Sequence, residues 1–357
     1  MLPLASKILL FPYWLILSVR NFLYDKAILK SEKFDVPIVS IGNISVGGTG
    51  KTPHIELLLS SFQDRYKVAV VSLGYKRKTK GLYIVRENDD YTRCGDEPLQ
   101  IKRKFPSVIV AVCKKREVAI RTLIEKYNVD LILLDDGYQY RKVTPQCNVL
   151  LVNYKRSITK DNLLPIGRLR DLPSQKNRAD IVVISKSPNF AREDGNDYDY
   201  LAAERVKVED KRWRKELRLK ESQKLYFSTI CYDELKPVFE QVENHRYVYS
   251  KFAICFSGIA NDFEFKAQLV GYYTIEKNMK FADHKNYSKR DILKITKIAR
   301  RLPEAVIITT EKDSVRLVTN KYIPDDIKAR MFYLPLYSKI IPAVAEEDFI
   351  KSVLSSE

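Results

Sequence analysis

The residues best suited to chemistry form one glycine-rich stretch, which reads Ser45, Val46, Gly47, Gly48, Thr49, Gly50, Lys51 and Thr52. The spacing matches the phosphate-binding pattern G-x-x-x-x-G-K-S/T, the P-loop, except that serine replaces the first glycine. Glycines allow backbone N–H groups to face phosphate oxygens, and a following helix N-terminus adds positive charge. Lys51 can reach the outer phosphates and Thr52 can ligate Mg²⁺. These eight residues are predicted to bind a nucleotide.

Two acids that could complete a nucleotide site follow another apolar stretch. Residues 129–134 are predicted to form a buried strand, and the chain continues with Asp135 and Asp136. Carboxylates at the tip of a strand commonly hold the Mg²⁺ that accompanies a P-loop nucleotide. Asp135 and Asp136 are therefore candidate metal ligands, together with Thr52.

Other polar residues follow expected strand ends or open an expected helix, where open α/β sheets place ligand contacts. They are Tyr75, Arg77, Gln139, Asp96 and Glu97. Arg168, Arg170 and Asp171 instead lie in a loop rich in proline and glycine. By itself, the Pro/Gly loop at residues 163–171 is expected to be a solvated surface segment.

The elements that would position these residues alternate between strands and helices. Apolar residues 36–41 precede the P-loop, and Pro53 can occupy the first turn of the helix that follows. Further buried strands are expected at residues 67–72, 108–112, 129–134, 148–152 and 181–185. This alternation predicts an α/β fold like that of P-loop NTPases, with a mostly parallel sheet and helices on both faces.

A highly charged segment at residues 198–224 precedes a second set of expected strands. These strands, at residues 225–230, 252–256, 305–310 and 331–334, predict a smaller α/β unit. The expected division is an N-terminal helix at residues 1–30, a P-loop domain at 31–210 and the smaller unit at 211–357.

The N-terminal segment is apolar and aromatic. Residues 8–19 contain no charge, and Lys7 and Arg20 flank them. A spanning helix needs roughly 20 apolar residues, so this run is too short to cross a bilayer. Two interpretations remain open, a helix lying in a membrane surface and a helix packed on the protein's own core.

Composition limits the classes of partner. The formal net charge of +17 over 357 residues favours anionic membrane surfaces or polyanions. No nucleic-acid-reading motif is recognisable, and no nucleic-acid partner is expected. The five cysteines lack CxxC spacing, which argues against a disulfide framework or a zinc site.

Seven motifs, taken in order, resemble tetraacyldisaccharide 4′-kinase, the lipid A pathway enzyme of Gram-negative bacteria. They are GNISVGGTGKTP (residues 42–53), GYKRK (74–78), GDEP (95–98), DDGYQ (135–139), LPIGRLRD (164–171), FADH (281–284) and TTEKD (309–313). Three residues depart from the family's usual pattern: Leu73 stands in place of arginine, Tyr140 of histidine and Asp171 of glutamate.

The resemblance implies transfer of the γ-phosphoryl group of ATP to the 4′-hydroxyl of tetraacyldisaccharide 1-phosphate, with Mg²⁺ as cofactor and lipid IV-A as product. It implies two α/β/α lobes joined by a hinge. It also implies a peripheral protein at the cytoplasmic face of the inner membrane, with an anionic membrane surface and a lipid substrate as partners.

The resemblance further implies a role for each candidate residue. Lys51 would stabilise phosphate charge, Asp96 would act as the base for the sugar hydroxyl, and His284 would orient Asp96. The implied metal ligands are Thr52, Asp135, Asp136 and Glu97. The implied contacts to substrate or nucleotide are Tyr75, Arg77, Gln139, Arg168, Arg170 and Asp171. Without the resemblance, His284 would be expected to be structural.

Two other functions fit parts of the sequence. A membrane-associated P-loop ATPase of the partitioning or chaperone type needs the P-loop and acids but no base for a sugar hydroxyl. It would release phosphate without a lipid acceptor. A basic membrane- or nucleic-acid-binding module with a vestigial P-loop would not bind Mg²⁺-ATP.

Overall fold

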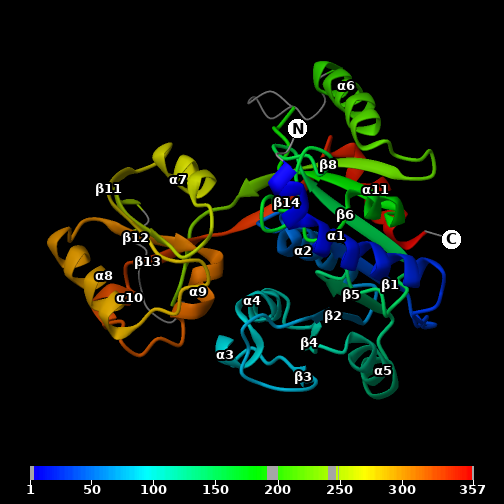
Figure 1. The fold of residues 1–357 in the computed structure, drawn as a ribbon. Coiled ribbons are helices and arrows are strands. Elements are labelled where there is room, and N and C mark those ends of the chain that lie inside the picture. Colours follow the sequence, from blue (N-terminus) through cyan, green and yellow to red (C-terminus); the bar gives the residue numbers. More distant parts are fainter. Residues whose placement is uncertain (1–3, 191–199, 240–246, 248, 356–357) are drawn as a thin grey trace.

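The computed structural model describes residues 4–190, 200–239, 247 and 249–355. Two sheets, each with its own helices, form a larger and a smaller part of the molecule, which lie side by side in Figure 1. Residues 1–3 of the expected N-terminal helix and residues 198–199 of the charged segment lie outside the described residues.

The larger sheet has the strand order β14-β8-β7-β6-β1-β5-β2-β4-β3. Its strands are β1 (Ile38–Gly42), β2 (Val68–Ser72), β3 (Tyr83–Ile84), β4 (Ile109–Val112), β5 (Leu131–Asp135), β6 (Cys147–Asn153), β7 (Ile181–Ser185), β8 (Lys224–Tyr232) and β14 (Leu336–Ile341). The terminal strands β3 and β14 pair antiparallel with their neighbours, and the remaining pairs are parallel. The expected mostly parallel sheet is confirmed.

Helices cover both faces of this sheet, because successive strand residues point to opposite sides. In β1, Val39 and Ile41 pack with one set of helices, and Ile38 packs with the other. The first set is α2 (Lys51–Phe62), α4 (Asp96–Lys104) and α11 (Val344–Leu354). The second set is α1 (Leu4–Asp25), α5 (Arg116–Tyr127) and α6 (Tyr200–Leu217). Short helices α3 (Tyr91–Cys94) and η1 (Pro173–Arg178) lie in connections.

The smaller sheet has the order β11-β10-β12-β13-β9. Its strands are β9 (Lys236–Pro237), β10 (Phe252–Ser257), β11 (Thr274–Lys280), β12 (Val306–Thr310) and β13 (Met331–Leu334). Its helices are α7 (Phe263–Val270), α8 (Lys289–Arg301), α9 (Glu311–Leu317) and α10 (Asp325–Lys328). Residues of α7 and α8 pack with alternate residues of β10 and β12, so this sheet is also covered on both faces.

The smaller sheet is an insertion within the larger one. Strand β8 leads out of the larger sheet and β14 returns to it, pairing antiparallel with β8. The smaller sheet therefore begins at Lys236 and ends at Leu334, and α11 packs on the core of the larger part. The expected range 211–357 for the smaller unit differs from this topology. An apolar strand does not reveal from its sequence alone which of two sheets it joins.

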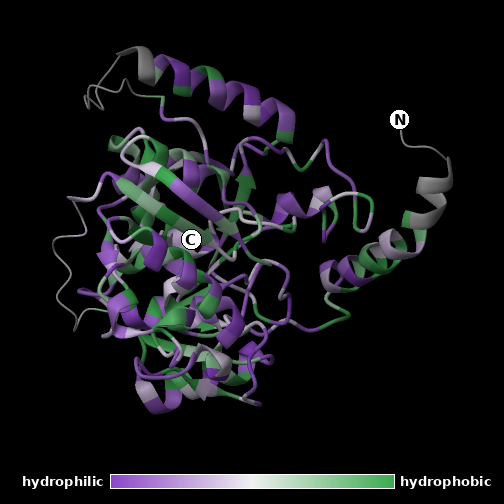
Figure 2. Ribbon diagram, turned by 90° about the vertical axis from the view of Figure 1, so that its left-hand side faces the viewer, coloured by the Kyte–Doolittle hydropathy of each residue, from purple (hydrophilic) through white to green (hydrophobic). Residues whose placement is uncertain are grey.

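Helix α1 has two apolar faces. Leu10 and Leu17 are buried against the larger part, and Asn21 donates a 2.9 Å hydrogen bond to the buried carboxylate of Asp171. The opposite face is exposed and includes Phe11, Trp14, Leu15, Ile16, Val19 and Phe22. Figure 2 shows α1 projecting from one side of the molecule. Packing on the protein's own core therefore explains why one face of α1 is apolar, but it does not explain the exposed apolar face. None of the helices in the described residues is long and apolar enough to span a bilayer.

Candidate active site

The P-loop joins β1 to α2, and its shape depends on two glycines. Gly47 and Gly50 have φ values of 112° and 84°, in the region that side chains disfavour. Asn43 donates Nδ2 to Thr49 Oγ1 at 2.6 Å, which ties the two ends of the loop together. Residues 46–48 are exposed. The backbone N–H groups of Gly47 and Gly48 and the N-terminus of α2 can therefore face an anionic ligand, whereas Val46 N–H donates to the carbonyl of Arg168.

The two expected acids lie next to this loop because β5 pairs with β1. The pairing register places Asp135 beside Ile41, shortly before the P-loop. The Ser72 hydroxyl donates to Asp135 at 2.9 Å, and Lys51 Nζ lies 3.8 Å from Asp136 Oδ1. The structure thus brings Lys51 and both acids together.

The two acids differ in their electrostatic surroundings. Burial and the negative charges of Glu97 and Asp136 raise the pKa of Asp135 to about 6. For Asp136, burial opposes ionisation, but hydrogen bonding to Arg170 and the charge of Lys51 outweigh it and lower the pKa. The Oδ1 atom of Asp135 is buried and has no hydrogen-bond partner among the described residues.

A second cluster joins the two parts of the molecule. Asp96 opens α4 in the larger part, and His284 follows β11 in the smaller part. His284 Nδ1 lies 2.9 Å from Asp96 Oδ2. The backbone N–H of His284 donates to the carbonyl of Gly258 at 3.1 Å. This hydrogen bond holds the backbone of His284 in place. The two residues expected to act together are thus in direct contact.

Two cations from α9, which the sequence analysis did not identify, complete this cluster. Arg316 donates Nε to Asp96 Oδ2 at 3.0 Å, and a second bond runs from its Nη2 to the same oxygen. Lys312 Nζ lies 2.8 Å from Glu97 Oε1 and 3.3 Å from His284 Nε2. Lys312 and Arg316 are four residues apart and share a helix face. The TTEKD motif contains Lys312 and could have indicated it, whereas Arg316 lies three residues beyond that motif.

These neighbours determine the charge state of Asp96. Burial opposes its ionisation, but the hydrogen bond from His284 and the charges of Lys312 and Arg316 outweigh burial. They hold the pKa of Asp96 far below its ordinary value. The Lys312 ammonium group has no acceptor, so it is the hydrogen-bond donor to His284 Nε2. This arrangement is consistent with a His284 tautomer that carries its proton on Nδ1 and donates to Asp96.

Three of the expected contact residues lie close to these two clusters. Tyr75 is exposed, and its ring centroid lies 5.1 Å from that of His284. Arg168 is exposed beside the P-loop, where its carbonyl accepts a 2.7 Å hydrogen bond from Val46 N–H. Arg170 binds Asp136 through both terminal nitrogens of its guanidinium group.

The other three have internal partners. Arg77 donates to the carbonyl of Val112 at 2.8 Å, and Gln139 Nε2 donates to the carbonyl of Arg170 at 2.9 Å. Asp171 is fully buried. The sequence predicted that these side chains contact substrate or nucleotide. In the structure they satisfy backbone groups or anchor α1, because the loops around the P-loop need hydrogen-bond partners.

An ionic cluster with two buried glutamates links the three helices that carry these residues. Lys104 Nζ of α4 lies 2.7 Å from Glu56 Oε2 of α2 and 3.3 Å from Glu311 Oε1 of α9. Burial and the charge of Glu311 raise the pKa of Glu56 to about 7, against the opposing effect of Lys104. The cluster fixes α2, α4 and α9 relative to one another.

Comparison with known proteins gives consistent matches. The family model described as tetraacyldisaccharide-1-P 4'-kinase matches residues 4–355. Tetraacyldisaccharide 4'-kinase of Porphyromonas gingivalis W83 is 40% identical over 90% of this chain and 88% of its own length. The protein of that name from Phocaeicola vulgatus is 38% identical over 89% of this chain and 85% of its own length. The solved structure of the "apo" form of LpxK from Aquifex aeolicus in complex with ATP has a TM-score of 0.72 and 28% identity. That match covers 99% of this chain and 98% of the other.

Proposed function

The chain belongs to the tetraacyldisaccharide 4′-kinase family, and we propose that it transfers the γ-phosphoryl group of ATP to the 4′-hydroxyl of tetraacyldisaccharide 1-phosphate, forming lipid IV-A. This is a step of lipid A biosynthesis. The observation that carries the proposal is the contact between Asp96 and His284 across the two parts, next to a P-loop. ATP hydrolysis requires the P-loop, whereas transfer to a sugar hydroxyl also requires a group that aligns and deprotonates that hydroxyl.

In this reaction, Lys51 and the P-loop N–H groups neutralise charge on the outer phosphates of ATP. Phosphoryl transfer depends mainly on positioning and charge neutralisation, because little covalent chemistry falls to the protein. Lys51 already faces Asp136 at 3.8 Å, so it lies at the mouth of the loop beside the acids.

Asp96 is the proposed base, and His284 is the residue that orients it. The low pKa of Asp96 keeps it ionised but makes it a weak base. A weak base suffices if the transition state is loose, because the attacking hydroxyl then loses its proton late. Tyr75 packs on the His284 ring and limits its rotation.

Lys312 and Arg316 would enter the site with the smaller part. We propose that the β8–β9 and β13–β14 connections form a hinge, because only these two crossings join the two sheets in the described chain. Arg316 already contacts Asp96, and Lys312 already contacts Glu97, so opening the hinge would break these contacts and closing it would restore them and exclude water from the phosphates. This arrangement would couple substrate binding to assembly of the site.

The residues beside the P-loop fit a divalent cation. The buried Oδ1 of Asp135 has no hydrogen-bond partner among the residues described, and a cation would provide one. No group of three or more histidine, cysteine or acidic side chains in the described chain could hold a metal by itself. We propose Thr52, Asp135, Asp136 and Glu97 as ligands, directly or through water, alongside the phosphate oxygens of the nucleotide. Bound Mg²⁺ would offset negative charge on the transferred and leaving oxygens.

The exposed apolar face of α1 supports a peripheral position at a membrane surface, which we propose to be the cytoplasmic face of the inner membrane. Phe11, Ile16 and Phe22 are 56%, 64% and 55% exposed, an unfavourable arrangement in water that insertion into a bilayer surface would relieve. Lys26 and Lys30 follow this face and are exposed. They would contact anionic headgroups. Arg168 and Tyr75 are the accessible candidates for contacts to the lipid substrate's headgroup.

One experiment separates this proposal from the two alternatives. The purified protein is incubated with Mg²⁺-ATP and tetraacyldisaccharide 1-phosphate, and both the lipid product and free phosphate are measured. We expect the lipid to gain one phosphate at the 4′ position, with little free phosphate when lipid is omitted. Phosphate release without a lipid product would instead indicate an ATPase, and failure to bind Mg²⁺-ATP would indicate a vestigial P-loop.

A further inference from the structure

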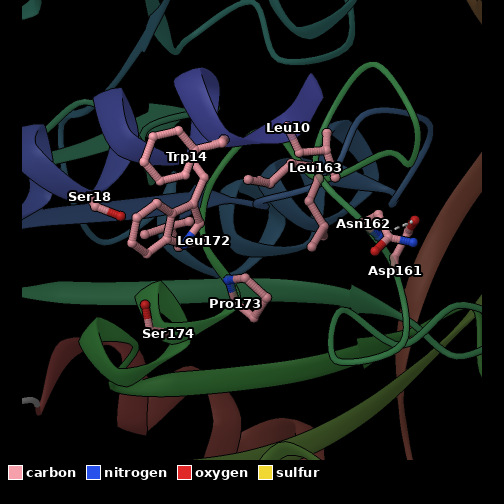
Figure 3. Close-up of a pocket in the computed structure, with 11 residues that line it drawn as sticks. Leu10, Trp14, Ser18, Asp161, Asn162, Leu163, Leu172, Pro173 and Ser174 are labelled. Atoms are coloured by element: carbon pink, nitrogen blue, oxygen red, sulfur yellow. Dashed lines mark hydrogen bonds between the residues drawn. The ribbon is translucent and has the colours of Figure 1, made fainter. Parts of the chain in front are cut away.

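His54 is a buried histidine to which the proposed reaction assigns no role. It lies in the first turn of α2, three residues after Lys51, and it is only 1% exposed. Burial lowers the pKa of its imidazole to about 4, so the ring is uncharged at neutral pH. The groove of about 540 Å³ in Figure 3 is lined by residues of α1 and of the segment 161–174, so it does not involve His54. The role of His54 therefore lies in the contacts that its ring makes within the protein.

The two ring nitrogens of His54 contact different segments of the chain. Nδ1 lies 2.6 Å from the carbonyl oxygen of Gly50, the residue directly before Lys51. Because a carbonyl oxygen can only accept, Nδ1 carries the ring proton and donates it. Nε2 is then an acceptor, and it lies 2.8 Å from Ser228 Oγ on β8 and 3.1 Å from Ser338 Oγ on β14. His54 thus joins the end of the P-loop to two strands of the larger sheet.

We propose that His54 is a positioning residue that orients the peptide between Gly50 and Lys51 for nucleotide binding, an inference that rests on the nucleotide site of the proposed function. In a trans peptide, the carbonyl of one residue and the N–H of the next point in opposite directions. The ring holds the Gly50 carbonyl toward α2, so Lys51 N–H points out of the helix N-terminus, where a P-loop binds phosphate. The helical bond from His54 N–H to the same carbonyl is 3.2 Å long, so the ring makes the closer of the two contacts.

The two serines anchor this contact in strands that flank the proposed hinge. Ser338 pairs with Ile230, two residues beyond Ser228, so both hydroxyls lie on the same face of the sheet. On this face a side chain at Gly50 would lie 3.7 Å from Ile230 Cδ1, which shows how closely the P-loop approaches β8. Strand β8 leads to the smaller part and β14 returns from it. His54 therefore links the phosphate loop to the strands that carry the smaller part.

The test compares variants that keep or lose the hydrogen bond to Gly50. His54→Leu removes both ring contacts, whereas the side-chain amide in His54→Asn can still donate from near the position of Nδ1. The affinity for Mg²⁺ with a non-hydrolysable ATP analogue is measured by calorimetry without lipid, together with the melting temperature. We expect His54→Leu to weaken binding about threefold to tenfold, as expected for the loss of one hydrogen bond. His54→Asn should restore most of this affinity.

A pair of smaller changes keeps the test valid if His54→Leu does not fold. Ser228→Ala combined with Ser338→Ala leaves the ring in place and removes its anchor, which should weaken binding of the analogue at least about twofold. In the His54→Leu protein the same two changes should add no further loss, because residues of one hydrogen-bond network are not additive. The matched control is Thr229→Val, which removes a hydroxyl from the opposite face of β8 and should leave the affinity unchanged.

Several outcomes would overturn this role for His54. An unchanged affinity in a folded His54→Leu protein or in the paired serine variant would do so, even if the melting temperature falls, because core packing explains that fall. Equal losses in His54→Asn and His54→Leu would exclude the bond to Gly50 as the cause. Because binding is measured without lipid, a protein that binds the analogue but phosphorylates no disaccharide would refute the proposed function alone. A wild-type protein that does not bind the analogue would refute both.

Discussion

At the scale of single residues, Lys51 carries much of the charge that the proposed reaction needs at the phosphates. We expect Lys51→Ala to lower kcat by about 10²–10³-fold, the usual effect of losing one electrostatic contact to a transition state. The melting temperature should change little, because the one ion pair that Lys51 makes with the described residues is a 3.8 Å contact with Asp136. Steady-state kinetics and thermal unfolding measure the two effects. Lys126→Ala, an exposed lysine on α5, serves as the control. Near wild-type turnover in Lys51→Ala would remove this lysine from the mechanism.

The sequence was sufficient for residues whose neighbours are close in the chain, and insufficient for those positioned by other elements. The P-loop glycines and Lys51 are readable because the motif is continuous. Lys312 and Arg316 belong to the smaller part and approach Asp96 only through the packing of α9 on α4. The internal role of Arg77 likewise depends on a carbonyl 35 residues away, at Val112.

One departure from the family pattern has a local explanation. The Tyr140 ring lies 4.9 Å from the Arg116 guanidinium group, and the Tyr140 hydroxyl binds Glu117. Arg116 in turn donates to the backbone carbonyls of Asp135 and Asp136 at 3.2 and 3.0 Å. Tyr140 therefore helps to position Arg116, which in turn holds the backbone of Asp135 and Asp136. Nothing in the structure explains the departure at Leu73.

At the scale of helices and strands, the Glu56–Lys104–Glu311 cluster predicts a pH dependence of stability. The pKa of Glu56 is about 7 in the folded protein, whereas an unperturbed glutamate has a pKa of about 4.3. Between these two values the unfolded chain releases a proton that the folded protein keeps. Rising pH therefore favours unfolding in this window. We expect stability to fall as the pH rises from about 4.5 to about 7.

Glu56→Gln should reduce this fall, because glutamine cannot ionise and can still hydrogen-bond to Gln100. The measurement is the denaturant midpoint of unfolding at several pH values across this window. Glu125→Gln, an exposed residue of α5, is the matched control and should retain the wild-type slope. If Glu56→Gln and the wild type show the same slope, Glu56 is not the titrating group.

Helix α1 yields a prediction about membrane binding. Replacing the exposed Ile16 and Phe22 by serine should weaken binding to anionic vesicles and slow reaction with the lipid substrate. ATP affinity should not change, because neither side chain contacts the P-loop. Vesicle co-sedimentation and nucleotide titration measure these two properties. Equal vesicle binding by a folded double variant would refute the interfacial role. Leu17→Ser should instead lower stability, because Leu17 is buried in the core.

Element types were easier to predict than their grouping. The strand and helix alternation follows from apolar runs and was readable for the parallel strands of the larger sheet, whereas its terminal strands β3 and β14 were not predicted. The assignment of β8 and β14 to that sheet was not readable, because their pairing with β7 and with each other is long-range. The two faces of α1 illustrate the same limit. Both are apolar, and only tertiary structure shows which one the core covers.

At the scale of the whole molecule, the proposed mechanism requires the two parts to meet at one point. Asp96 and Glu97 belong to the larger part, and His284, Lys312 and Arg316 to the smaller. In the described residues the chain crosses between the two parts only at the strands that flank the insertion, so the contact between Asp96 and His284 would be lost if the parts opened and regained when they close on the substrates. Closure would also limit wasteful hydrolysis by excluding water.

The most direct test of this account is the turnover of Asp96→Asn, His284→Ala and the double variant, measured with saturating ATP and lipid substrate. We expect each single variant to lose about 10²–10⁴-fold in kcat, with far smaller changes in ATP affinity. The double variant should be little worse than the worse single variant, because residues that act as a unit are not additive. Losses that multiply fully, or an Asp96→Asn protein with near wild-type turnover, would contradict the claim that this pair forms the catalytic base.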